Sequence, residues 1–552
     1  MATGTFRRFA LTPEVAHAAL RDPDLRRLQA AWMAVNAGRW AYLVTNLVVA
    51  YEAGGPAATG LLGLATFLAP TVLAPLSGIP TARWRPERVL AAVTALRAVA
   101  VLLTVALVAL DGPLAALLLL VTLEAGSGAF TRPLHMAILP LIARTPSELV
   151  ASNVAASAAE GIGTFAGPAL SGLLIGFTGP AGSHLSVLVL YALAVVAIAG
   201  MRVPASVATG HVAALRSHLL AGARAAATTP APRLLIGTFI IQTGVRGALV
   251  VLTVVAAIEL LGMGEPGVGM LNAALGAGGF VGAVAAIALA GRPRLGPWVS
   301  VALTGWGLPI IAIGLVPHPA AALALMVVIG ISNAVLDVAG FTLLQRTTPN
   351  TVRIAVLGLF DSLANGTQAV GGLLAPLLLV TLGLEGALAV TGLVLPILAL
   401  ATWPAIRRLD EEAVVDSARI AQIRADPLFA PLSMAIIEQL AGQLEPENFA
   451  AGQWILREGT AGDRYHIVRE GRVQVSQAGR VVRECGPGEG LGEIALLRRV
   501  PRTASVRALT PVETLALGRD DFLAAVTGHP ASRLAADEVV EARLASPPAD
   551  RT

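Results

Sequence analysis

The residues best suited to chemistry lie together in one stretch near the C-terminus, Gly486 to Val506. Its glycines let backbone N–H groups approach an anion closely, and runs of such amides form anion-binding concavities. Arg502 follows Pro501 and offers a planar fork of donors that suits a phosphate, while Glu493 offers acceptors for sugar hydroxyls. The stretch therefore predicts a pocket for one phosphate and one ribose.

The segment around this stretch predicts a small fold made mainly of strands. A helix that ends near Leu444 precedes it, and two helical segments follow it after Arg519. Between them lie short alternating segments separated by glycine turns, which is typical of an antiparallel roll or barrel. These segments are 453–456, 465–468, 473–475 and 480–483.

We call the stretch from Gly486 to Val506 the cassette. From about 427 to 545, the order of strands, glycine turns and cassette resembles the cyclic-nucleotide-binding domain. The resemblance implies that Glu493 accepts the ribose 2′-hydroxyl and that Arg502 pairs with the cyclic phosphate. It assigns the rest of the cassette to Gly492, Ile494, Ala495, Thr503 and Ala504. It also implies a lid over the base, formed by Leu534, Val539, Val540 and Leu544, with Arg543 beside them. The alternative is a roll that has lost its ligand, but both the Glu and the Arg are present. We favour cAMP, the commoner bacterial ligand, and cGMP stays open.

The composition places most of the chain in a lipid bilayer. Of 552 residues, 55% are hydrophobic and 13% are charged, whereas soluble chains average about 25% charged residues. A span needs about 20 apolar residues. Twelve candidate spans result: 28–52, 57–79, 88–110, 114–140, 150–176, 184–201, 234–261, 267–290, 297–316, 320–344, 352–381 and 384–405.

The distribution of arginine among the predicted loops tests the number of spans. Loops that contain arginine alternate with loops around Gly54, Asp111, Gly179, Gly264, His318 and Gly383, which contain none. By the positive-inside rule both termini and the nucleotide pocket are expected in the cytoplasm, with the bundle in the plasma (inner) membrane. The net charge of +4 is carried by arginine, since lysine is absent, and it does not indicate nucleic-acid binding.

The first and second halves of the bundle repeat each other. Arg39 and Glu52 recur as Arg246 and Glu259 at an offset of 207 residues, and small residues from Ser157 onward recur at 205. Parallel repeats are a transporter plan with the substrate path between the halves. The expected fold is an α-helical membrane bundle of twelve transmembrane helices plus a small α+β domain with an antiparallel β-roll. The expected parts are an amphipathic helix (1–27), the two halves (28–201 and 234–407), an inter-half loop (202–233), a linker (408–426) and the nucleotide domain (427–546).

Residues from about 10 to 407 resemble the major facilitator superfamily. Gly163 to Gly172 is close to a Gly/Pro motif of drug:proton antiporters, which allows close helix packing. The loop from Gly78 to Arg85 resembles the family's gating loop but has Ala82 in place of the expected acid. Thr131 to Pro140 resembles the macrolide- and siderophore-exporter branch. The resemblance implies proton-coupled export of small amphipathic molecules.

Charged residues within the spans are the candidates for substrate or proton handling, because a charge in hydrocarbon is costly unless it faces a cavity or a partner. The alternative is a static buried pair that fixes helix packing. Glu52 and Glu259 are interpreted as solvated helix ends, and Arg97 as a packing or snorkelling residue. The candidates are Arg39, Glu124, Glu160, Arg246, Asp337 and Asp361, and Arg132 recurs as Asp337 at an offset of 205.

Other functions lack a signature in the sequence. No nucleophile–base set, P-loop or HExxH motif predicts an enzyme, and the single cysteine, Cys485, permits neither an intrachain disulfide nor a cysteine metal cluster. A cyclic-nucleotide-gated channel would need a pore-loop filter, which is absent. A receptor that does not transport, or a nucleotide site that serves assembly, stays open. The expected partners are a cyclic nucleotide, the bilayer and a small-molecule substrate, with no prediction for the oligomeric state.

Overall fold

The computed structural model describes residues 22–73, 84–142, 146–201, 203, 230–287, 289, 294–348, 350–413, 417–432, 434–528 and 530–545. The chain divides into two compact units, Met1–Asp410 and Glu411–Thr552. The expected amphipathic helix (1–27) and inter-half loop (202–233) lie almost wholly outside the described residues, so both stay predictions.

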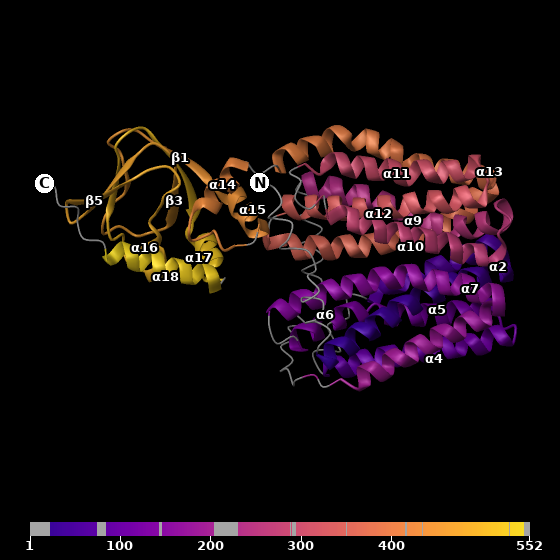
Figure 1. Cartoon of the computed structure of the whole chain (residues 1–552). Helices are drawn as coiled ribbons and strands as arrows, with labels where there is room; N and C mark the ends of the chain where they lie inside the picture. The colour runs from indigo at the N-terminus through magenta and orange to yellow at the C-terminus, as the bar shows by residue number, and fades with distance from the viewer. Residues whose placement is uncertain are drawn as a thin grey trace. The chain divides into compact units, whose positions relative to one another are not determined.

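The described part of the first unit is helical, and Figure 1 shows its helices side by side in two groups, α2 to α7 and α9 to α13. The first group contains α2 (Pro23–Leu73), α4 (Pro86–Ala109), α5 (Leu114–Gly128), α6 (Thr131–Ile142) and α7 (Pro146–Ala199). The second contains α9 (Pro230–Val255), η3 (Ala256–Leu260), α10 (Gly264–Ile287), α11 (Gly296–Leu315), α12 (Pro319–Thr347) and α13 (Asn350–Ala413).

Among the described residues, 9 helices are long and apolar enough to cross a membrane. Three of them are interrupted by glycines with positive φ: Gly55 in α2, Gly179 in α7 and Gly383 in α13. Each interruption coincides with a loop that lacks arginine, and we call this side of the bundle the arginine-free end. A multi-pass helical bundle is therefore present, while the number of twelve spans stays a prediction.

Glycines bring the helices of the bundle into backbone contact, because a residue without a Cβ allows two helices to approach closely. A Cβ at Gly167 of α7 would lie 2.4 Å from the carbonyl oxygen of Ala37 in α2. A Cβ at Gly172, farther along α7, would lie 2.9 Å from Cα of Gly269 in α10. The Gly/Pro motif thus packs α7 against its own group and against the other one, as the sequence predicted.

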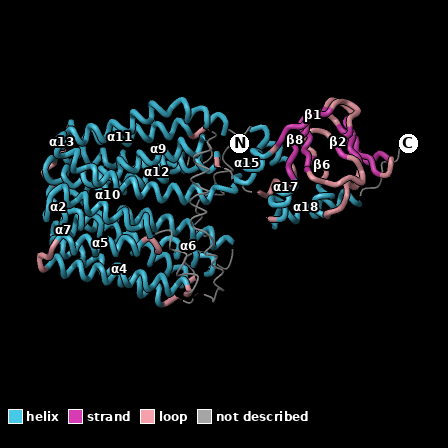
Figure 2. Tube along the Cα trace, turned by 180° about the vertical axis from the view of Figure 1, so that it is seen from behind, coloured by secondary structure: helices cyan, strands magenta, loops and turns pink. Residues whose placement is uncertain are grey.

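The second unit is a roll of two antiparallel sheets between helices, drawn with magenta strands in Figure 2. One sheet has the order β1-β8-β3-β6 and the other β2-β7-β4-β5. The side chains of Phe429, Tyr465 and Phe522 pack together in its core. The strands are β1 (Glu445–Phe449), β2 (Trp454–Leu456), β3 (Arg464–Glu470), β4 (Val473–Gln477), β5 (Arg480–Cys485), β6 (Gly490–Leu491), β7 (Ser505–Ala508) and β8 (Val512–Gly518). The helices are α14 (Ser417–Ala425), α15 (Met434–Gln443), α16 (Glu493–Arg498), α17 (Arg519–Thr527) and α18 (Pro530–Ala545).

Candidate functional site

The candidate cassette begins where β6 ends. Gly492 connects β6 to α16 with φ of +90°, in the left-handed region that favours glycine. A Cβ at this position would lie 2.2 Å from Nη1 of Arg502. The position therefore needs glycine both for its backbone conformation and for the close approach of the arginine.

Arg502 is buried within the roll, with 4% of the residue exposed. Its Nη1 donates to the carbonyl oxygen of Gly492 (2.9 Å) and its Nη2 donates to that of Arg464 (2.7 Å). Burial lowers the pKa of Arg502, and the carboxylates of Asp463 and Glu493 oppose this shift. Because a guanidinium has about five N–H donors, this anchored cation keeps donors for an anion.

Glu493 is also buried, and its carboxylate forms an ion pair with an arginine from a helix that is distant in the sequence. Nη1 of Arg543 in α18 lies 2.5 Å from Oε1 of Glu493, and only 3% of the Glu493 side chain is exposed. Burial lowers the pKa of Arg543, but the Glu493 carboxylate outweighs it, so that the pKa is raised overall. The sequence placed Arg543 near a base, and its pairing with Glu493 was not anticipated.

The other predicted cassette residues surround these two side chains. Ala495 is buried, and a Cβ at Gly462 would lie 2.9 Å from its Cβ and 3.2 Å from Cζ of Arg502, so the turn before β3 packs over the cassette. Ile494, Thr503 and Ala504 are half-buried.

Of the predicted lid residues, Val540 is buried and Val539 packs against the core of the roll. Leu534 is 66% exposed. The side chain of Leu544 is outside what the structure describes. The lid therefore stays a prediction.

A second polar contact ties the start of the unit to the strands of the site, and the sequence did not reveal it. Tyr465 Oη of β3 donates to Asp426 Oδ2 over 2.5 Å. Burial raises the pKa of both groups; for Tyr465 the Asp426 carboxylate raises it further, whereas for Asp426 the hydrogen bond from Tyr465 opposes the shift. Asp426 lies within the segment interpreted as a linker.

Charged side chains inside the bundle form two kinds of arrangement. The first is a buried network: Arg97 Nε donates to Glu124 Oε1 over 2.9 Å, and Tyr191 Oη donates to the same oxygen over 2.7 Å. Arg97 is 1% exposed, so it packs in the interior and does not snorkel. Glu124 is thus bonded to two buried side chains, and its role in transport stays a prediction.

The second arrangement consists of exposed side chains. Arg132 Nη1 lies 3.7 Å from Glu160 Oε1, with 69% and 38% of the two side chains exposed. Asp361 is exposed and interacts electrostatically with Arg132. Asn333 donates to Asp337 Oδ2 over 2.9 Å. The structure therefore brings Glu160 and Asp361 near one cation. Asp337 lies on a separate helix, where Asn333 donates to it and Arg246 interacts with it electrostatically.

Comparison with known proteins decides the family of the bundle. A family model described as "transmembrane secretion effector" matches residues 14–455. The chain belongs to this family of the major facilitator superfamily. A second model, the cyclic nucleotide-binding domain, matches residues 446–529. The protein is therefore a major facilitator transporter fused to a cyclic nucleotide-binding domain.

Curated relatives match the nucleotide-binding part. The chain is similar to cGMP-dependent protein kinase, isozyme 1, of Drosophila melanogaster (39% identity over 108 residues, 18% of this chain and 14% of the relative). It is also similar to the cAMP-dependent protein kinase regulatory subunit of Eremothecium gossypii (36% over 101 residues, 18% and 22%). A third is the potassium/sodium hyperpolarization-activated cyclic nucleotide-gated channel 2 of Mus musculus (36% over 118 residues, 21% and 14%). The chain thus spans less than a quarter of these relatives, and the kinases match only its binding domain.

The two halves of the transporter unit meet at the arginine-free end. Tyr51 of α2 donates a hydrogen bond to Glu259 of η3, and the carboxyl group of Glu52 lies near that of Glu265 in α10. Glu52 and Glu259 are exposed, as solvated helix ends would be. They also connect the halves, which the sequence did not indicate.

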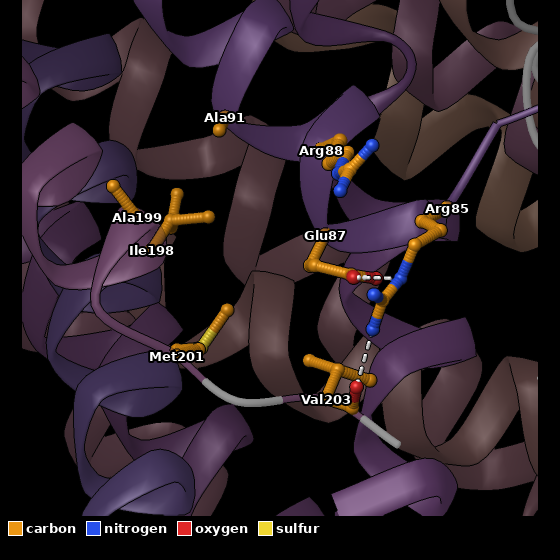
Figure 3. A pocket seen from close by; sticks show the side chains of 8 residues that line it. All are labelled: Arg85, Glu87, Arg88, Ala91, Ile198, Ala199, Met201 and Val203. Atoms are coloured by element: carbon orange, nitrogen blue, oxygen red, sulfur yellow. Dashed lines mark hydrogen bonds and ion pairs between the residues drawn. The ribbon is translucent and has the colours of Figure 1, made fainter. Parts of the chain in front are cut away.

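A surface hollow at the start of α4 lies apart from all these candidates (Figure 3). Arg85 Nε pairs there with Glu87 Oε1 over 2.6 Å, and its Nη2 donates to the carbonyl oxygen of Val203 over 2.5 Å. Arg85 ends the loop that resembles the family's gating loop, whose residues up to 83 are outside the described part. Arg85 is thus fastened by Glu87 and by backbone that follows α7.

Proposed function

We propose that the protein is a proton-coupled exporter of small amphipathic molecules, and that a cyclic nucleotide bound to its second unit regulates transport. cAMP is the favoured nucleotide and cGMP the alternative. In this proposal the bundle crosses the plasma membrane and the second unit lies in the cytoplasm. The observation that carries the regulatory part is the ion pair between Arg543 and Glu493.

The ion pair links occupancy of the site to the position of a helix. If the ribose 2′-hydroxyl of a cyclic nucleotide donates a hydrogen bond to the Glu493 carboxylate, it competes with Arg543, which belongs to α18. Nucleotide binding then releases or shifts α18. A ligand changes a conformational equilibrium only by its differential affinity for the two states, typically about 1–3 kcal/mol of coupling. Breaking one partly buried ion pair is of this order.

Glu160 and Asp361 are the proposed proton carriers. Both are accessible carboxylates within reach of the Arg132 cation, so a movement of Arg132 between states would change their proton affinity. Glu124 is a weaker candidate because Arg97 and Tyr191 already bind it. Unchanged pH dependence of transport in both Glu160→Gln and Asp361→Asn would remove this part of the proposal.

Calorimetry of the full chain with cAMP and cGMP tests the regulatory site. Glu493→Ala combined with Arg502→Ala should abolish binding, because it removes both the ribose acceptor and the phosphate cation. A matched control is Arg469→Ala with Glu513→Ala, which removes a 3.0 Å ion pair of the roll outside the cassette. The control should bind as the wild type does. Tight binding by the cassette variant would refute the site assignment.

A further inference from the structure

A buried carboxylate lies beside the strand that leads into the cassette. Only 2% of Asp426 is exposed. Tyr465 Oη donates to its Oδ2 over 2.5 Å, and the backbone N–H of Leu428 donates to its Oδ1 over 3.0 Å. A Cβ at Gly490 of β6 would lie 2.8 Å from the same Oδ2, and Gly490 is three residues before Glu493. The Asp426 carboxylate therefore packs against the backbone that positions Glu493.

The groups that face Asp426 come from three elements of the roll. They are Tyr465 of β3, Glu493 of α16 and Arg543 of α18, and each of them interacts electrostatically with Asp426 or is hydrogen-bonded to it. Arg543 is the cation among these three groups, and it forms the ion pair with Glu493. One cation therefore compensates the charge of two buried carboxylates.

The position of Arg543 therefore affects the proton affinity of Asp426. Burial raises the pKa of Asp426, the hydrogen bonds from Tyr465 and Leu428 and the Arg543 cation oppose this shift, and Glu493 adds to it. In the proposed regulation a bound nucleotide displaces Arg543 from Glu493. Asp426 then loses a cation while it stays buried beside Glu493, and the loss of an opposite charge raises the pKa of a carboxyl group further.

We propose that Asp426 is a proton-binding site linked to the nucleotide site, so that binding of a cyclic nucleotide is accompanied by uptake of a proton from solvent on Asp426. This inference rests on the proposed regulatory function and adds its dependence on pH. Because the nucleotide-bound protein holds more protons, nucleotide affinity increases as pH falls. Asp426 directly follows α14, so a change in its charge also acts on the contact between the end of α14 and β3.

Calorimetric titration of the full chain with cAMP tests the inference. Titration at one pH in two buffers of different ionisation enthalpy counts the protons that are taken up on binding. The wild type should take up a fraction of a proton for each cAMP bound. An average uptake of about a quarter of a proton makes Kd about threefold lower at pH 6 than at pH 8.

Two variants should abolish this uptake for different reasons. Asp426→Asn keeps an acceptor for Tyr465 but cannot take up a proton, so its Kd should not change between pH 6 and pH 8. Arg543→Gln removes the cation from Asp426 in the free and in the bound protein, so binding no longer changes its proton affinity. Glu513→Gln is the matched control, because it removes a carboxylate that pairs with Arg469 outside the cassette, and it should take up protons as the wild type does.

Equal proton uptake by the wild type and Asp426→Asn, or binding of cAMP to the wild type without proton uptake, would overturn this inference alone. Uptake retained in Arg543→Gln would also overturn it, and this variant leaves Asp426 in place if Asp426→Asn does not fold. Absence of cAMP binding to the wild type would overturn both the regulatory proposal and the inference. Uptake that depends on Asp426, in a protein whose transport ignores cAMP, would refute the regulation of transport alone.

Discussion

Replacing Arg543 by Gln should make cyclic-nucleotide binding tighter. In the ligand-free protein this substitution removes the charged partner of Glu493, which has 3% of its side chain exposed, whereas 23% of the Arg543 side chain is exposed. Breaking a fully buried pair costs about 3–5 kcal/mol and an exposed pair contributes about 0–1 kcal/mol. Because one side chain of the Arg543–Glu493 pair is buried and the other is partly exposed, we expect breaking it to cost an amount between these limits, about 1–2 kcal/mol.

In the variant, the ligand-free state is destabilised by this amount, because Glu493 has lost its charged partner. The nucleotide-bound state is not destabilised, because a ribose hydroxyl would donate a hydrogen bond to Glu493. The free energy of binding should therefore become more favourable by about 1–2 kcal/mol, which is about 5- to 30-fold in Kd. Calorimetric titration of the full chain with cAMP measures the change. Arg533→Gln, an exposed arginine on the same helix, is the matched control and should bind as the wild type does.

Two outcomes would refute this reasoning. If Arg543→Gln weakened binding tenfold or more, Arg543 would be a direct contact of the nucleotide and not its competitor. If the affinity did not change, the ion pair would have no link to occupancy of the site.

Gly492→Ala should weaken cyclic-nucleotide binding at least tenfold in calorimetry, because its Cβ would collide with Arg502 at φ of +90°, while Gly486→Ala, which meets nothing within 4 Å, should bind normally. Burial, with Arg502 and Arg464 nearby, lowers the pKa of His466 to about 4. Its contribution to stability is therefore present above its ordinary pKa of about 6.5 and lost as pH falls through 4, on the order of 3 kcal/mol. Hydrogen exchange of β3 should show this loss in the wild type and not in His466→Gln, and identical pH profiles would contradict it. Tyr51→Phe removes a hydrogen bond between the halves and should shift the bundle a few-fold toward opening at the arginine-free end. Spin-label distances between α2 and α10 at that end measure the shift, and an unchanged distribution would argue against the contact.

Much of the structure around the candidate nucleotide site could be predicted from sequence because its parts are local. Gly492, Glu493 and Arg502 lie within eleven residues, and the turns that separate the strands carry glycine. Strand β1 was missed because Glu445–Phe449 contains a proline and two glutamates, and it exists only through its pairing with β8. The partner of Glu493 was missed because Arg543 is fifty residues away, and nothing local specifies that contact.

In the membrane unit, too, local features could be predicted from sequence and contacts between distant residues could not. Composition and loop charges predicted the apolar helices, and the Gly/Pro motif predicted the close packing of α7. The span predicted over 114–140 matches one apolar segment, Leu114–Ile142, and the local interruption between α5 and α6 at residues 129–130 was not predicted. Arg97 and Glu124 were interpreted separately, since the hydrogen bonds between them depend on how α4 packs against α5.

The central claim is that a nucleotide on the second unit changes transport by the first. Its most direct test is the flux of labelled small amphipaths in proteoliposomes, with and without saturating cAMP on the side of the second unit. A coupling of about 1–3 kcal/mol predicts a change of roughly 5- to 150-fold at most in the wild type, and no change in the Glu493→Ala, Arg502→Ala variant. Equal flux with and without cAMP, in a wild-type protein shown to bind it, would contradict the claim.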